Sequence, residues 1–285
     1  MAEPKESFLK NNDDSCLYYR YIPNNSAKYT LVLLHGFLSS SFSFRKMVPL
    51  LEADYAILLI DWPPFGKSKK SKKFIYSYEN IAASILQLLR SFQFESVVLV
   101  GHSMGGQLIL HMVKQQPDIA VKMILINGSA YIPRSKQSLI LASYLPFAHR
   151  FVKRWLEKTG VEGNLRTAIH ESEKIDQEMI NGYLEPFLSD DIFHGLIRFL
   201  RHREGDLSSA KIRRIQTPCL LIYGQFDKVV PFHIGKRLAQ DLSNSRLMMV
   251  ENAGHLLPEE KPEEICRVLK EFVNDEGKDH TKNLL

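Results

Sequence analysis

The sequence predicts an α/β fold, in which a mostly parallel central sheet carries helices on both faces and is interrupted by an all-helical insertion. Short apolar segments alternate with segments whose apolar residues recur at helical spacing. Strands that are apolar throughout are typical of a parallel sheet covered on both faces. Between Pro133 and about Gln216 the alternation stops, and that stretch reads as helices alone.

The strand predictions rest on runs of apolar and β-branched residues. An extended segment is expected at Cys16–Ile22, before a turn through residues 23–25. Further strands are expected at residues 29–34, 55–60, 97–100 and 123–126, and after the insertion at residues 219–223 and 247–250.

The helix predictions rest on apolar residues spaced three and four apart. Helices are expected at residues 42–51, 81–92, 107–114, 234–242 and 263–273. The α/β core is therefore assigned to residues 1–132 and 217–285. The helical insertion is assigned to residues 133–216, as a cap over the carboxyl edge of the sheet, where open parallel sheets bind their ligands.

Composition excludes several classes of protein. The 285 residues are 45% hydrophobic and 24% charged, which is ordinary for a globular chain. The net charge is +5, and five lysines lie between Lys67 and Lys73. A lysine-rich loop is typical of a solvated surface, and this one lacks the interleaved aromatic residues that stack on bases. We expect no nucleic-acid partner.

Cysteine usage and hydropathy indicate a cytoplasmic protein. Cys16, Cys219 and Cys266 lie far apart, with no CxxC pair, and are expected as free thiols. The first fourteen residues have no apolar segment typical of a signal peptide, and no apolar run is long enough to span a bilayer. We expect no stable membrane insertion, and a monomer or a homodimer.

The segment Gly101-His102-Ser103-Met104-Gly105 has the spacing of a nucleophile elbow, G-x-S-x-G. Three fixed residues are weak support by themselves, but here the motif joins a β-branched run to a helical segment, as the elbow requires. The glycines leave room for a sharp turn, and the following helix N-terminus favours negative charge near Ser103. Ser103 is the predicted nucleophile.

A serine needs a base, and the base needs an acid to orient it. Asp227 follows the strand at residues 219–223, so its carboxylate is expected at the same sheet edge as the elbow. His255 follows the last strand directly, whereas the other histidines fall in helices, in the insertion or on the surface. The end of the strand before the insertion carries Asn127, which cannot serve as the acid. The order Ser103, Asp227, His255 fits the order of this kind of triad.

Acyl transfer also needs N–H donors for an oxyanion. We expect one donor at Met104, directly after the nucleophile, and a second at Phe37, in the loop after the strand at residues 29–34. Gly36 lets that backbone approach closely, and Gly36 and His102 are expected to line the substrate site. His35 is expected to brace the loop rather than react.

These motifs together resemble the α/β-hydrolase superfamily, in particular bacterial serine hydrolases with a helical cap. The resemblance rests on His35-Gly36-Phe37, the segment from Asp61 to Ser68, the elbow, Gly224-Gln225-Phe226-Asp227 and Gly254-His255, which span nearly the whole chain outside the insertion. The segment from Asp61 to Ser68 resembles the loop that shapes the rim of the active site in this family.

The resemblance implies hydrolysis without a cofactor or metal. Dehalogenases and epoxide hydrolases of the family use an aspartate nucleophile, whereas this chain has Ser103. Carbon–carbon bond hydrolases usually have Asn where this chain has His102, and use a cap arginine that could not be assigned among Arg198, Arg201 and Arg203. We expect an ester hydrolase acting on a small or medium apolar acyl ester. A carbon–carbon hydrolase of vinylogous diketones and a small-molecule sensor with slow turnover are the alternatives.

The stretch 138–156, inside the expected cap, is apolar at its start and basic toward its end, and Pro146 is expected to break it. Three interpretations are open. The stretch packs its apolar side onto the core, it offers an apolar wall to an acyl chain, or it touches a membrane through Arg150, Lys153 and Arg154.

Overall fold

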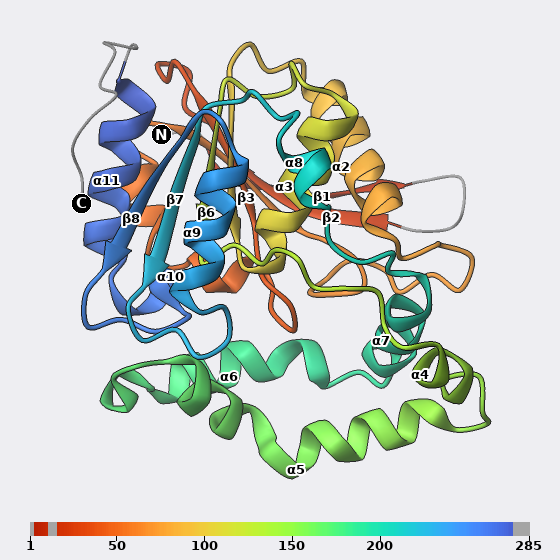
Figure 1. Ribbon diagram of the computed structural model, residues 1–285. Coiled ribbons are helices and arrows are strands. Elements are labelled where there is room, and N and C mark those ends of the chain that lie inside the picture. Colours follow the sequence, from red (N-terminus) through yellow and green to blue (C-terminus); the bar gives the residue numbers. More distant parts are fainter. Residues whose placement is uncertain (1–2, 11–15, 276–285) are drawn as a thin grey trace.

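The structure, a computed structural model, describes residues 3–10 and 16–275 and contains a twisted eight-stranded sheet (Figure 1). The strand order is β1-β2-β4-β3-β5-β6-β7-β8. The strand β2 pairs antiparallel with β1 and with β4. The other pairs, along the order β4-β3-β5-β6-β7-β8, are parallel. The strands are β1 Lys5–Lys10, β2 Cys16–Ile22, β3 Thr30–Leu34, β4 Ala56–Asp61, β5 Val97–His102, β6 Lys122–Ile126, β7 Cys219–Gly224 and β8 Ser245–Val250. The expected α/β-hydrolase fold is confirmed.

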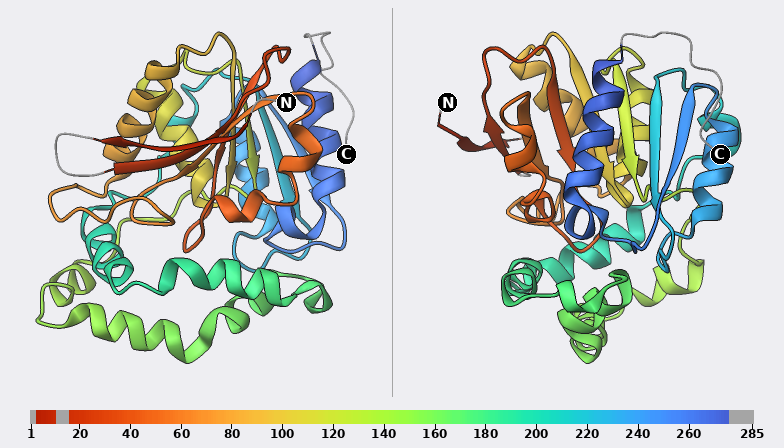
Figure 2. Two further views of the ribbon diagram at one scale, coloured as in Figure 1. Left: turned by 180° about the vertical axis from the view of Figure 1, so that it is seen from behind. Right: turned by 90° about the vertical axis from the view of Figure 1, so that its left-hand side faces the viewer.

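Helices cover both faces of this sheet (Figure 2). The helices of the core are η1 Ser41–Phe44, α1 Val48–Leu51, α2 Tyr78–Phe92, α3 Met104–Gln115, α9 Phe232–Asp241, α10 Leu257–Glu260 and α11 Pro262–Asn274. Between β6 and β7 lie α4 Gln137–Ala142, α5 Ala148–Ala168, η2 Ser172–Lys174, α6 Gln177–Leu184, η3 Glu185–Phe187, α7 Asp191–His202 and α8 Ser209–Ile212.

Strand residues alternate between two hydrophobic clusters, one on each face of the sheet. In β3, Val32 and Leu34 pack with α2 and α3, whereas Leu31 and Leu33 pack with α1 and α11. The other parallel strands at the centre of the sheet alternate in the same way. Because successive side chains of a strand point to opposite faces, a strand covered on both faces must be apolar throughout. This is why the uninterrupted apolar runs of the sequence located the strands.

The stretch from residue 133 to residue 216, all of which the structure describes, contains helices and no strand. We call it the helical insertion. Its helices α4, α5 and α6 form a layer beyond one edge of the sheet, at the bottom of Figure 1. The short helix α8 instead lies beside α9, and Ile212 joins the main core cluster. Within the described residues, none of the helices combines the length and the apolar character that crossing a bilayer requires.

Local differences from the expected elements have physical causes. The strand β1 was not expected, because its residues are polar and exposed; it pairs with β2 at the edge of the sheet. The helix expected at residues 42–51 divides into η1 and α1. The chain breaks at Pro146 as expected, between α4 and α5, and α5 continues through a kink at Gly160.

Candidate functional site

Ser103 lies in a sharp turn between β5 and α3. Its backbone angles are φ 52° and ψ −118°, a conformation that is strained for a residue with a side chain. Ser103 is the N-cap of α3, so Met104 is the first residue of the helix, and the first N–H groups of a helix have no partner within it. The turn therefore holds Ser103 beside backbone donors and the positive end of a helix dipole.

Two glycines make this turn possible. A Cβ on Gly101 would lie 2.6 Å from the backbone of Gly105 and Gly106, and a Cβ on Gly105 would lie 2.1 Å from the carbonyl oxygen of Leu34. Distances this short exclude any side chain at either position. The two glycines of the G-x-S-x-G motif are thus required by close backbone contacts.

His255 and Asp227 meet in a direct hydrogen bond. The Nδ1 of His255 lies 2.7 Å from Oδ2 of Asp227, and both residues are buried. A carboxylate only accepts hydrogen bonds, so Nδ1 carries the proton and Nε2 is left as a proton acceptor. Both residues follow the carboxyl ends of neighbouring strands, β8 and β7, as the sequence predicted.

The carboxylate of Asp227 is held ionised by several donors. Its Oδ1 accepts the N–H of Val229 at 2.7 Å and of Val230 at 2.8 Å. Burial raises the pKa of Asp227, but the hydrogen bonds from His255, Asn127 and Val230 outweigh burial and hold the pKa below its ordinary value.

Asn127 belongs to this network, although the sequence singled it out only as a position that could not supply the acid. Its Nδ2 donates to Oδ2 of Asp227 and, at 3.3 Å, to the carbonyl oxygen of Gly254. The backbone of Asn127 is left-handed, with φ 47°. Its place directly after β6, at the sheet edge shared with Asp227, was the feature of the sequence that could have identified it.

His102 is 2% exposed and lies against His255. Its Nε2 lies 2.8 Å from the carbonyl oxygen of His255, so Nε2 carries the proton and donates it. Burial lowers the pKa of His102 to about 3, which keeps the ring neutral at neutral pH. The sequence analysis assigned His102 to the substrate, and the contact that the structure gives it is with the His255 loop.

The loop after β3 approaches Ser103 closely. A Cβ on Gly36 would lie 3.2 Å from Cβ of Ser103 and 3.1 Å from Nδ1 of His102. Phe37 follows in the same loop and is 42% exposed, with its ring 5.2 Å from that of Phe65. The loop containing Phe37 is therefore next to the serine, as expected.

His35 braces this loop by two contacts with Trp62. The backbone N–H of Trp62 donates to Nε2 of His35 at 3.3 Å, and Nε1 of Trp62 donates to the carbonyl oxygen of His35 at 2.8 Å. The two rings stack at 5.3 Å. Burial lowers the pKa of His35, which favours the neutral ring that accepts from Trp62.

Glu260 joins the His255 loop to the helical insertion, and the sequence analysis missed it. Its carboxylate, which is 4% exposed, accepts the N–H of Gly254 at 3.0 Å and of Leu256 at 3.1 Å. The same carboxylate accepts the N–H of His170 at 2.8 Å. The N–H of His255 itself donates to the carbonyl oxygen of Ala168, at the end of α5, at 2.7 Å. A buried carboxylate five residues after His255 was the only indication that the sequence offered.

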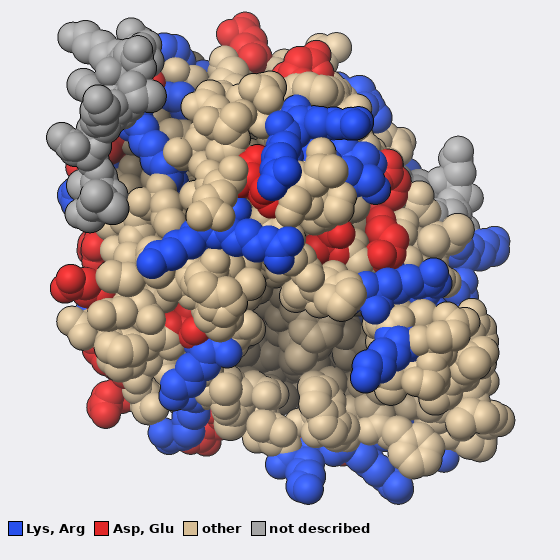
Figure 3. Space-filling view, viewed as in Figure 1, with Lys and Arg blue, Asp and Glu red and all other residues tan. Residues whose placement is uncertain are grey.

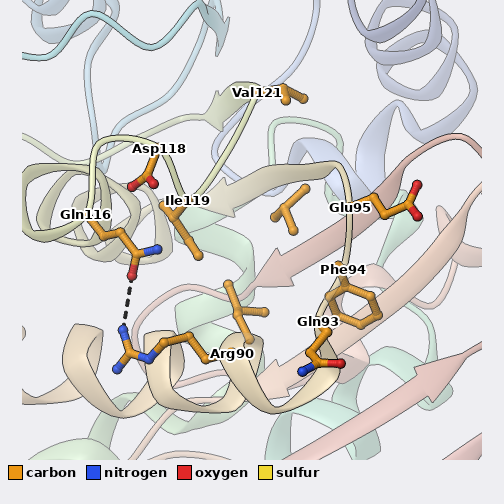
Figure 4. A pocket seen from close by; sticks show the side chains of 10 residues that line it. Arg90, Gln93, Phe94, Glu95, Gln116, Asp118, Ile119 and Val121 are labelled. Atoms are coloured by element: carbon orange, nitrogen blue, oxygen red, sulfur yellow. Dashed lines mark hydrogen bonds between the residues drawn. The ribbon is translucent and has the colours of Figure 1, made fainter.

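The surface is hollowed between the sheet edge and the helical insertion in the view of Figure 3. A separate pocket of about 300 Å³ lies at the opposite edge of the sheet, where β5 and β6 begin (Figure 4). Arg90 and Gln116 join across its wall by a hydrogen bond of 3.0 Å. This second pocket is remote from Ser103 and lacks histidine, serine and cysteine among its lining residues.

One group of side chains in the described residues has the spacing of metal ligands. Ligand atoms of Glu79, His111 and Glu204 lie within 4.8 Å of one another. Glu79 already pairs with Lys114 at 3.0 Å, and both oxygens of Glu204 accept backbone N–H groups at the start of α2. These contacts give the carboxylates a structural role, and the proposal below does not involve a metal.

Comparison with known proteins places the chain in a family. The alpha/beta hydrolase fold model matches residues 29–262, and the chain belongs to that family and is a hydrolase. It is 46% identical over 257 residues to "Uncharacterized hydrolase YugF" of Bacillus subtilis, covering 90% of this chain and 94% of the relative. It is 30% identical over 255 residues to "Putative carbamate hydrolase RutD" of Pseudomonas syringae, covering 86% and 93%.

Solved structures agree on the fold. An esterase from Thermogutta terrifontis superposes with a TM-score of 0.76 at 19% identity, covering 95% of this chain and 98% of the esterase. At this identity the likeness concerns the fold alone. Several relatives are named as hydrolases of different kinds, among them a "Putative esterase/lipase" of Haemophilus influenzae and a 2-hydroxy-6-oxononadienedioate/2-hydroxy-6-oxononatrienedioate hydrolase of Paraburkholderia phymatum, whereas another is named as a magnesium-chelatase subunit of Rhodobacter capsulatus.

Proposed function

We propose that this hydrolase cleaves carboxylic esters through an acyl-enzyme on Ser103. The observation that carries the proposal is the hydrogen bond of 2.7 Å between His255 and Asp227, at the sheet edge where the strained turn of Ser103 lies. A strained serine, a histidine with one free nitrogen and a buried carboxylate are the components of a serine hydrolase triad.

In the proposed mechanism, Nε2 of His255 takes the hydroxyl proton of Ser103 as Oγ attacks the ester carbonyl carbon. The bond between the carbonyl carbon and the alcohol oxygen then breaks, and His255 gives its proton to the leaving alcohol. Asp227 orients the ring and stabilises its positive charge. A water molecule repeats the sequence on the acyl-enzyme, releasing the acid and restoring Ser103.

The oxyanion of each tetrahedral intermediate is assigned to the N–H groups of Met104 and Phe37. The place of Met104 at the first position of α3 and the closeness of the loop at Gly36 to Ser103 support this assignment. The exposed ring of Phe37 lies 6.2 Å from that of Phe199 in α7, so an apolar acyl group would find aromatic contacts from both the core and the helical insertion.

We assign the helical insertion, residues 133–216, the role of a cap over this site. Its contacts with the His255 loop support the assignment, since Ala168 and His170 both bond to that loop or to Glu260. The cap would close the side of the site that the sheet leaves open, and exclude water from an apolar acyl group.

An ester is preferred to a carbon–carbon bond because two of the three candidate cap arginines, Arg201 and Arg203, have structural contacts within the helical insertion. Arg201 donates to Oγ of Ser143 at 2.9 Å and stacks 4.0 Å from the ring of Tyr144. Arg203 donates to the carbonyl oxygen of Pro133 at 2.7 Å and lies near Asp206. Both guanidinium groups thus hold the insertion together, which leaves them poorly placed to bind a diketone substrate.

The test is a series of p-nitrophenyl esters from acetate to palmitate, with initial rates for the wild type and for Ser103→Ala. We expect turnover to fall by about a million-fold in the variant, as triad deletions do elsewhere. The chain-length optimum measures the space under the cap. Circular dichroism of Ser103→Ala checks that the variant folds.

Two results would redirect the proposal. A loss of only about tenfold in Ser103→Ala would show that another group is the nucleophile. A folded wild type that cleaves no ester but cleaves a vinylogous diketone would make it a carbon–carbon hydrolase, whereas micromolar ligand binding with negligible turnover would make it a sensor.

A further inference from the structure

The outer face of α4 and α5 is apolar and exposed. Large apolar side chains of this face are between 54% and 70% exposed: Leu139, Leu141, Tyr144, Leu145, Phe147, Phe151 and Trp155. We call these seven residues the outer apolar surface. The helices α4 and α5, with the turn between them, lie along the lower margin of the molecule in Figure 1.

The helix α5 has two apolar sides, and only one of them is used for packing. Val152 and Leu156 are partly buried and pack against the main core cluster. Phe151 and Trp155 in α5 and Phe147 at its N-cap, spaced four residues apart, are exposed by 70%, 69% and 57%. The exposure of these three rings is therefore not explained by the packing of the insertion onto the core.

Basic residues run beside these three rings. Arg150, Arg154 and Lys158 are also spaced four residues apart and are exposed. Residues 133–168 contain seven Lys or Arg and two Asp or Glu, an excess of five that equals the net charge of the whole chain. Elsewhere the two signs balance, at thirty each. Figure 3 shows Lys and Arg side chains along the same lower margin, with uncharged surface between them.

We propose that the outer apolar surface docks on an anionic lipid bilayer. An exposed stripe of Phe, Leu, Tyr and Trp flanked by Lys and Arg is the composition of helices that lie in the plane of a membrane interface. The aromatic side chains enter the interface, and the basic side chains meet anionic headgroups. Two successive helices contribute residues to the outer apolar surface, so it is broad enough to lie against a flat bilayer.

Charge distinguishes the bilayer from a second copy of this chain. In a symmetric dimer across this face, the basic stripe of one copy would lie near the same stripe of the other. Such like charges repel, whereas an anionic bilayer attracts both stripes without a specific geometry. Docking of this kind is reversible and peripheral, and it turns the helical insertion toward the lipid.

The tryptophans provide a direct measurement. The chain has two, and Trp62 is fully buried in the core, whereas Trp155 is 69% exposed and belongs to the outer apolar surface. Phosphatidylcholine vesicles containing phosphatidylglycerol should shift the emission of Trp155 to the blue and protect it from iodide quenching. Vesicles of phosphatidylcholine alone should bind at least about tenfold more weakly, and high salt should weaken binding to the anionic vesicles.

Variants locate the surface. Phe147→Ser/Phe151→Ser and Arg150→Glu/Arg154→Glu should each lower the vesicle partition coefficient by about tenfold or more. The matched controls Phe8→Ser, an exposed aromatic residue of β1, and Lys211→Glu/Arg214→Glu, in α8 and just after it, should leave it unchanged. All of these substitutions are at exposed positions, and circular dichroism checks each fold.

The outcomes separate docking from catalysis. Ser103→Ala should bind vesicles as the wild type does, so that vesicle binding is independent of the proposed hydrolysis. No binding of the wild type to anionic vesicles, or equal binding by the surface variants and the controls, would overturn the proposal. Concentration-dependent dimerisation that Phe147→Ser/Phe151→Ser abolishes, without vesicle binding, would also overturn it and make the surface a dimer interface.

Discussion

The α/β core and the helical insertion use apolar residues in opposite ways. In β5, Val98, Leu99 and Val100 are fully buried, and each has a place in one of the two clusters on the faces of the sheet. In the helical insertion, the apolar side chains of Phe151 and Trp155 are exposed instead, in a segment that also carries basic residues. An apolar pattern therefore indicates which residues favour burial, but it does not identify the element or partner that buries them.

The groups proposed to carry the reaction and the charged groups of the insertion also differ in burial. Ser103, Asp227 and His255 are buried and lie in the core, at positions fixed by strand ends. The charged groups of the insertion lie mostly on its surface. We therefore expect large effects from substitutions in the core site, small effects on the outer face of the insertion, and intermediate effects where the two regions meet.

The largest difference between the regions is expected for two aspartates, Asp227 in the core site and Asp190 on the surface of the insertion. Asp227→Asn should lower kcat by about 10⁴-fold, because the amide favours the wrong tautomer of His255. Asp190→Asn, which loses an exposed contact of 2.6 Å with Lys153, should leave kcat unchanged. Steady-state kinetics on a p-nitrophenyl ester compares them. A loss below about tenfold in Asp227→Asn would mean that this carboxylate does not orient the base.

Acid should weaken the core site through His102. Its pKa is about 3 in the folded protein and 6.5 ordinarily, so the unfolded chain binds more protons between these values. The stability linked to His102 is therefore present above pH 6.5 and is lost as the pH falls toward 3, by up to about 5 kcal/mol. Measured by urea unfolding across this pH range, the free energy of unfolding should fall less steeply with decreasing pH in His102→Gln than in the wild type. Parallel curves for the two proteins would contradict the neutral, buried ring.

Two leucines compare packing directly. Leu99→Ala, in β5, should lower the free energy of unfolding by about 2–5 kcal/mol, because a fully buried side chain leaves a cavity. Leu141→Ala, 61% exposed on α4, should change it by less than about 0.5 kcal/mol. Urea denaturation measures both. A large loss in Leu141→Ala would show that the outer apolar surface is packed within the protein in solution.

The junction of the two regions should show an intermediate effect on catalysis. Glu260→Gln keeps the shape of the side chain but replaces one acceptor oxygen with a donor, so the His255 loop or His170 loses its bond. We expect kcat to fall by about tenfold through misplacement of His255, with little change in KM.

The neighbouring variant Glu259→Gln is the control for Glu260→Gln. Glu259 is also buried, but its carboxylate meets Arg45 and Lys46 and does not contact the His255 loop. If kcat fell in both variants in proportion to their loss of stability, the role of Glu260 would be structural and would not involve the position of His255.

Much of the core could be predicted from the sequence because its constraints are local. Strand β2 occupies Cys16–Ile22 as expected, and the glycines around Ser103 are required by contacts within a few residues of the turn or with the adjacent strand β3. The edge strand β1 was not predicted because its residues have no alternating apolar pattern. It forms by pairing with β2.

What escaped prediction at the site depends on contacts between distant parts of the chain. Asn127 bonds to a carboxylate one hundred residues later, and Glu260 bonds to His170, ninety residues earlier. Neither side chain belongs to a motif with fixed spacing. The exposure of Phe151 and Trp155 also depends on tertiary packing, since the sequence allowed the stretch 138–156 to pack on the core.

The most direct test of the central proposal is covalent labelling of the nucleophile. A fluorophosphonate probe reacts with the activated serine of a serine hydrolase, and mass spectrometry of the digested protein locates the adduct. We predict a single adduct on Ser103, no labelling of Ser103→Ala, and slow labelling of His255→Gln. An adduct on another residue, or equal labelling of the wild type and Ser103→Ala, would contradict the assignment of Ser103 as nucleophile.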